Sequence, residues 1–193
     1  REMYRISTES LRHELTDETW NRLTQMDQEV NRQQMQVRKK VFSHLAVARA
    51  RDLLTGLQLV SVVVDVERVG DYTKNIISLA RSYPSRLEGG SLEPDLVRIE
   101  ATVVENFDRT RAALEDSNEE LAHEVLKETS WLSKLCDERV HDLVAGNVED
   151  VTANQSTALA LYFRQLKRVN SHLGDVATAV VNPFDRIGFK PKD

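Results

Sequence analysis

Apolar residues recur every three or four positions over long stretches of the chain, with charged residues between them. This spacing is typical of helices that bury one face, and the valines do not fall in the alternating pattern of a half-buried strand. The pattern predicts helices over residues 2–14, 17–45, 48–81, 95–115, 118–144 and 151–181. Either Thr16 or Asp17 is suited to cap the second helix, because both side chains can accept a hydrogen bond from the first turn.

The third predicted helix is the most apolar, with aliphatic residues on nearly every side between Leu53 and Val69. A helix that is apolar all round belongs in the middle of a bundle. The second helix is strongly polar from Asn31 to Lys40, so much of it must face water.

Residues 82–94 hold two prolines, two glycines and three serines, a composition that predicts a linker. The order of a moderate, a polar and an apolar helix then restarts. A shift of 100 positions places Leu59 on Leu159 and Val69 on Val169, which indicates an internal repeat. We therefore expect an all-α fold of six helices in two tandem antiparallel three-helix bundles, residues 1–81 and 95–181, with an irregular tail over 182–193.

Composition excludes several classes of protein. The net charge of −5 argues against a general nucleic-acid binder, which needs a basic face. One cysteine, Cys136, cannot form an internal disulfide and fits a reducing compartment. The sequence contains no run of about 18 apolar residues, the length that spans a bilayer.

Candidate chemistry lies on the third helix, where Glu67, Asp71 and Asn75 are spaced by four and share one face. Two carboxylates on adjacent turns repel each other, and burial makes each charge costlier. A cation is therefore expected beside them, either a metal ion or a basic side chain. Gly70 lies between them and would permit close approach of another helix or a ligand.

The run from Glu67 to Ile76, ERVGDYTKNI, resembles the E-R-x-G-D-x-x-x-N-I signature of the PhoU family. Asp52-Leu53 stands where that family has D-L-R, with Leu54 in place of the arginine. Residues 116–125 are similar to its D-x-x-E-L-A-x-E-V run. The resemblance implies a non-enzymatic regulator of phosphate uptake at the cytoplasmic side of a phosphate transporter. Its implied partners are the transporter's membrane domain or a signalling protein, with homo-oligomers allowed and no nucleic acid.

PhoU proteins hold iron, zinc or similar ions in E/D-x-x-x-D motifs. The resemblance makes Glu67 and Asp71 the candidate ligands, with Asp27 and Glu29 from the second helix. Asn75 and Arg68 would contact these ligands without binding the ion themselves. All-carboxylate sites suit hard cations, iron and manganese. Two alternatives stay open: a divalent or ferric ion of the iron, zinc or manganese class in the first repeat only, or no ion, with pairing to Arg68 or Arg32.

The second repeat departs from the signature, because Lys167 and Ser171 replace the two carboxylates. An ammonium group repels a cation, so we expect no equivalent metal cluster there. The run LKRVNSH over residues 166–172 resembles PhoU-like domains at the C-terminus of bacterial sodium–phosphate cotransporters. Together with the missing initiator Met, it leads us to expect part of such a transporter. The alternatives are a free-standing PhoU-type negative regulator and a carboxylate-bridged metal-binding bundle.

Other motifs are weaker. Glu120–His123 and Glu138–His141 have the E-x-x-H spacing of di-iron bundles, but both fall on one predicted helix, too far apart to share an ion. The remaining histidines, His13, His44 and His172, show no clear partners in the sequence, and we expect a structural or surface role for each rather than ligation. The chain has no P-loop and no nucleophile motif.

Overall fold

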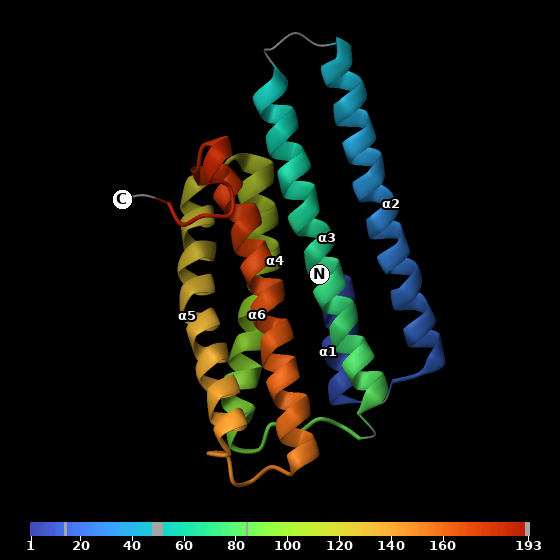
Figure 1. Cartoon of the computed structure of the whole chain (residues 1–193), viewed down its shortest axis with the longest axis vertical. Helices are drawn as coiled ribbons and strands as arrows, with labels where there is room; N and C mark the ends of the chain where they lie inside the picture. The colour runs from blue at the N-terminus through green and yellow to red at the C-terminus, as the bar shows by residue number, and fades with distance from the viewer. Residues whose placement is uncertain (14, 48–51, 84, 192–193) are drawn as a thin grey trace.

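The computed structural model describes residues 1–13, 15–47, 52–83 and 85–191, and within these ranges all regular structure is helical (Figure 1). The predicted all-α fold of six helices is confirmed. The helices are α1 (Glu2–Arg12), α2 (Asp17–Val47), α3 (Leu53–Ser82), α4 (Glu93–Asp116), α5 (Glu119–Ala145) and α6 (Ala153–Val181). Two short 3-10 turns, η2 (Gly90–Leu92) and η3 (Phe184–Arg186), lie in the predicted linker and tail.

Most predicted helix bounds lie within about two residues of the observed ones. The predicted end of the first helix at Glu14 and the start of the third at Ala48 lie outside the described residues, as do Pro84 of the linker and residues 192–193 of the tail.

Side-chain caps fix several of the helix starts. The Thr16 hydroxyl accepts a hydrogen bond from the Thr19 amide at 3.1 Å, and the Asn118 side chain accepts one from Leu121 at 3.0 Å. Thr152 and Gln155 form a reciprocal capping box at the start of α6. Because such caps depend only on neighbouring residues, these boundaries are readable from the sequence.

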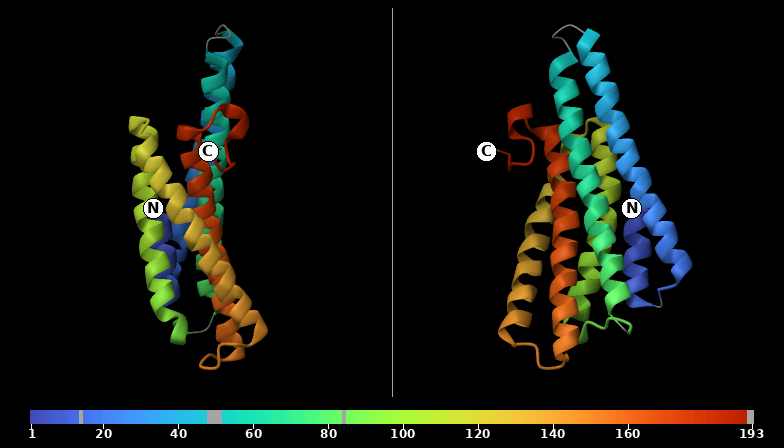
Figure 2. Two further views of the ribbon diagram at one scale, coloured as in Figure 1. Left: turned by 90° about the vertical axis from the view of Figure 1, so that its left-hand side faces the viewer. Right: turned by 45° about the vertical axis from the view of Figure 1, so that its right-hand side comes forward.

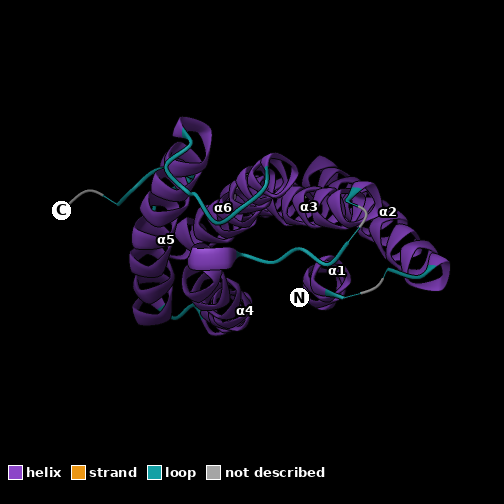
Figure 3. Ribbon diagram, turned by 90° about the horizontal axis from the view of Figure 1, so that it is seen from below, coloured by secondary structure: helices purple, strands orange, loops and turns teal. Residues whose placement is uncertain are grey.

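Helices α3 and α6 pack against each other in the middle of the molecule, with α2 and α5 at the two ends (Figure 3). Helices α1 and α4 lie on one side of this row and pack against α3 and α6, respectively. A single core cluster joins the two repeats. It contains Tyr4 and Leu11 of α1, Ile76 of α3, and Leu96 and Phe163 of the second repeat.

Helix α1 also contacts the interrepeat linker and helix α4 directly. The Leu87 amide donates a hydrogen bond to the Leu11 carbonyl at 3.0 Å. The Arg12 guanidinium, largely buried, forms ion pairs with Glu93 at 2.8 Å and Glu100 at 3.2 Å. The repeats therefore share one hydrophobic core and are also joined by hydrogen bonds and ion pairs.

The α2–α3 hairpin reaches beyond the other helices at the end opposite the interrepeat linker (Figures 1 and 2). Helix α1 has 11 residues where its counterpart α4 has 24, so it covers only part of the hairpin. The side chain of Leu59 is 47% exposed, whereas Leu159, at the same place in the repeat, is fully buried.

The expectation that the apolar third helix lies wholly inside the bundle is therefore wrong for its first half. The buried positions of α3 begin at Val69. The first half of α3 is only partly buried, because no described helix covers it as α4 covers α6. No described helix is long and apolar enough to cross a membrane.

Candidate functional site

The predicted acidic stripe lies where α3 packs against α2. Glu67 and Asp71 are on α3, and α2 contributes Asp27, whose side chain is buried. Partial burial, reinforced by the neighbouring Asp71 carboxylate, raises the pKa of Glu67. Gly70 is not required by this packing, because a Cβ there would lie 3.5 Å from Val30 Cγ1, an ordinary contact distance.

Basic side chains occupy the stripe. Lys74 Nζ lies 2.6 Å from Asp27 Oδ2, and Arg68 Nη1 lies 3.3 Å from Asp71 Oδ2. Arg68 Nε also lies 4.0 Å from Glu67 Oε2. Three carboxylates thus face two cations, which leaves one negative charge over. The pairing of Asp71 with Arg68 is the arrangement expected without a metal ion, and Lys74 is a partner that the sequence did not reveal.

The other two predicted residues turn away from the three carboxylates. Glu29 accepts hydrogen bonds from Arg32 and Gln33 on its own helix, and these bonds lower its pKa. Asn75 donates to Gln165 of α6 at 3.5 Å. The structure therefore brings Asp27 to Glu67 and Asp71, but not Glu29.

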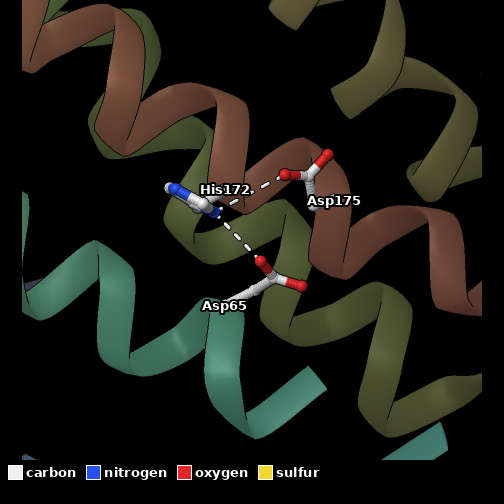
Figure 4. A group of neighbouring side chains, drawn as sticks. All are labelled: Asp65, His172 and Asp175. Atoms are coloured by element: carbon white, nitrogen blue, oxygen red, sulfur yellow. Dashed lines mark hydrogen bonds and ion pairs between the residues drawn. The ribbon is translucent and has the colours of Figure 1, made fainter. Parts of the chain in front are cut away.

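A second cluster lies between the two central helices. His172 and Asp175 of α6 point toward Asp65 of α3 (Figure 4). His172 Nδ1 lies 2.9 Å from Asp65 Oδ1 and 3.5 Å from Asp175 Oδ2. Partial burial and the charge of Asp65 raise the pKa of Asp175 to about 6. His172, which shows no clear partner in the sequence, therefore has two in the structure.

Aromatic and basic side chains hold the imidazole in place. The ring of His172 stacks on Tyr72 of α3, with centroids 5.4 Å apart and planes inclined by 15°. Arg168 lies over the same tyrosine and donates to its hydroxyl at 2.8 Å. One Arg168 nitrogen also lies 3.4 Å from Nε2 of His172. This stacking leaves Nδ1 directed at the two carboxylates.

Comparison with known proteins agrees with the resemblance of the ERVGD motif to the PhoU signature. Residues 1–80 match the family described as the PhoU domain. The chain is also 27% identical over 184 residues to the phosphate-specific transport system accessory protein PhoU homolog of Deinococcus radiodurans. That alignment covers 92% of this chain and 84% of the relative. Residues 1–80 are therefore similar to the PhoU domain, and the chain as a whole is similar to a PhoU homolog.

The second repeat has a different polar surface from the first. Lys167, in the place of Glu67, bonds Asp137 of α5 at 2.6 and 2.7 Å. Gly174 stands where the first repeat has Lys74. A Cβ added to Gly174 would lie 3.1 Å from the side chain of Thr129. The lysine of the first repeat's ion pair is thus replaced by a residue without a charged side chain in the second repeat.

The cluster of Asp65, His172 and Asp175 is not predicted by the sequence alone. The H-x-x-D spacing of His172 and Asp175 was visible, since residues three apart share a helix face. Asp65 was not, because it is 107 residues from His172 and joins the cluster only through the packing of α3 on α6.

Proposed function

We propose that this chain is a regulatory module of phosphate uptake that acts by docking on a phosphate transporter or its signalling partner at the cytoplasmic face. The observation that carries the proposal is the ERVGD motif within residues 1–80, the region that matches the PhoU domain. The named relative is an accessory protein of a phosphate-specific transport system.

A role in docking rather than catalysis is supported by what the polar residues do. Arg68 and Lys74 neutralise much of the acidic stripe. The only cysteine, Cys136, is fully buried, and desolvation raises its pKa to about 12, so its thiol is a poor nucleophile. A partner would therefore bind to helix surfaces, including those of the projecting α2–α3 hairpin.

The finer form of the proposal is a PhoU-like domain of a sodium–phosphate cotransporter, for which the run LKRVNSH at residues 166–172 is the supporting feature. A free-standing negative regulator of phosphate signalling is the alternative. The two differ in what the module controls: sodium-driven uptake in the first case, and transcription of phosphate-starvation genes in the second.

The test is charge reversal in the native host. Glu67→Lys with Asp71→Lys should change uptake of radiolabelled phosphate or expression of a starvation reporter. Glu29→Lys is the matched control, because Glu29 pairs only with its own helix. A sodium-dependent change favours the cotransporter, and a reporter change without it favours the free regulator. Normal uptake and normal reporter expression in a correctly folded double variant would refute the proposal.

Metal binding at the stripe is a second candidate, favoured by the negative charge left over among Glu67, Asp71 and Asp27. An ion of the iron, zinc or manganese class would have to displace Lys74 from Asp27, where Nζ lies 2.6 Å from the carboxylate. Lys74→Met should therefore raise metal affinity at this place, and Glu67→Gln should lower it. Isothermal titration of the chelator-treated protein measures both.

A further inference from the structure

In the cluster of Asp65, His172 and Asp175, two carboxylate acceptors face Nδ1 of His172, which can carry only one hydrogen. If Nδ1 of His172 carries a proton, that N–H donates to Asp65 Oδ1 at 2.9 Å. The Asp175 oxygen, 3.5 Å from the same nitrogen, then receives no hydrogen bond from any described residue. Two half-buried carboxylates therefore converge on a single nitrogen, and the second, whose side chain is 34% exposed, has no donor among the described residues but can accept hydrogen bonds from water.

The distances also match those between neighbouring ligands of a metal ion. Nitrogen and oxygen ligands bind zinc-class ions at about 2.0–2.2 Å. Neighbouring ligands around such an ion are about 3.0 Å apart in octahedral and about 3.4 Å apart in tetrahedral geometry, which follows from those bond lengths. The observed separations from Nδ1 are 2.9 and 3.5 Å, and one ligand atom of each residue lies within 4.8 Å of the others.

We propose that Asp65, His172 and Asp175 form a binding site for a borderline divalent cation of the zinc class, which joins the first repeat to the second. Asp65 comes from α3 and the other two ligands from one face of α6 (Figure 4). Imidazole and carboxylate groups are both zinc ligands, and three protein ligands with water completing the shell are the arrangement of catalytic zinc sites. Magnesium and calcium bind here more weakly, since they prefer all-oxygen shells.

The residues around His172 also suit a bound metal ion. Stacking on Tyr72 holds the imidazole ring, and a fixed ring is what metal-binding histidines require. A metal on Nδ1 places the ring proton on Nε2, so the 3.4 Å contact with Arg168 is given up. Arg168 keeps its 2.8 Å hydrogen bond to the Tyr72 hydroxyl. Because its positive charge opposes a cation nearby, removal of Arg168 should strengthen metal binding.

This site is distinct from the acidic stripe. It uses a different face of α3, it contains an imidazole, and none of Glu67, Asp71 and Asp27 belongs to it. Lys167, which would repel an ion, is turned to Asp137 on α5.

The experiment is titration of Zn²⁺ into the chelator-treated full chain by calorimetry, with Co²⁺ absorption as a second readout. The parent should bind at this site, show the visible bands of mixed nitrogen and oxygen ligation, and melt at a higher temperature with Zn²⁺. Asp175→Asn and His172→Ala should each weaken Zn²⁺ binding at least 100-fold, and Arg168→Gln should tighten it. Folding of every variant is checked by helix content in chelator.

Two controls separate the sites. His44→Ala removes an exposed histidine that pairs with Asp52, and it should leave Zn²⁺ binding unchanged. Glu67→Gln with Asp71→Asn should also retain this site, whatever it does to the regulatory function proposed above. Zn²⁺ binding that is absent, or that survives both Asp175→Asn and His172→Ala unaltered, overturns the proposal. In that case the cluster is only a hydrogen-bonded ion pair.

Discussion

The same leucine occupies equivalent positions of the two repeats in very different surroundings, and this permits a matched mutational test. Leu159 is fully buried in α6, whereas Leu59 in α3 is 47% exposed. Truncation of a fully buried leucine to alanine loses its transfer free energy and leaves a cavity, which costs about 3 to 4 kcal/mol. At Leu59 only about half of the side chain leaves water on folding and no closed cavity forms, so the loss is about 1 kcal/mol.

We therefore expect Leu159→Ala to lower the free energy of unfolding by about 2 to 3 kcal/mol more than Leu59→Ala does. Urea-induced unfolding followed by circular dichroism measures both, provided that the two variants share the parent's dependence on urea. Val69→Ala and Val169→Ala form the control pair. Their side chains are 7% and 0% exposed, and the two losses should be similar.

Equal losses at Leu59 and Leu159 would refute this reasoning. They would mean that the first half of α3 is covered in solution and that Leu59 is buried there as Leu159 is.

Three further predictions concern charged and reactive groups. Lys74→Met leaves the buried Asp27 carboxylate unpaired and should cost about 2 kcal/mol in urea unfolding, most of it recovered by adding Asp27→Asn. In chelator, the raised pKa of Asp175, about 6 against 3.8 for the free side chain, means that the folded protein holds this proton more tightly. The stabilisation by this bound proton is complete below pH 4 and is lost as the pH rises through 6. The free energy of unfolding of Asp175→Asn should therefore increase relative to that of the parent from pH 4 to 8. A difference that does not change with pH would contradict this. Cys136, fully buried and with its pKa raised to about 12, should not react with a disulfide reagent at pH 8 until the protein is unfolded.

Local features of this molecule could be predicted from its sequence because they depend on neighbouring residues. The starts of α2, α5 and α6 follow from Thr16, Asn118 and Thr152, whose side chains cap the helices. The stripe of Glu67 and Asp71 follows from a spacing of four, and the resemblance to the PhoU family follows from the motif that contains it.

Features that depend on tertiary packing could not be predicted in this way. The partner of Asp27 is Lys74, 47 residues away, and nothing in the local sequence distinguishes it from other lysines. Likewise, the apolar composition of α3 predicts burial, but the exposure of Leu59 depends on how far α1 extends along the hairpin.

The attachment of α1 to the second repeat has a consequence for the order in which the protein is made. Arg12 must pair with Glu100, which follows it by 88 residues. At a synthesis rate of about 5–20 residues per second, the ribosome adds Glu100 about 4 to 18 seconds after Arg12. During that interval Tyr4 and Leu11, which end in the shared core, have only the first repeat to pack against. The nascent first repeat therefore spends seconds with part of its final core surface still facing water, and it becomes fully native only after most of the second repeat has been synthesised.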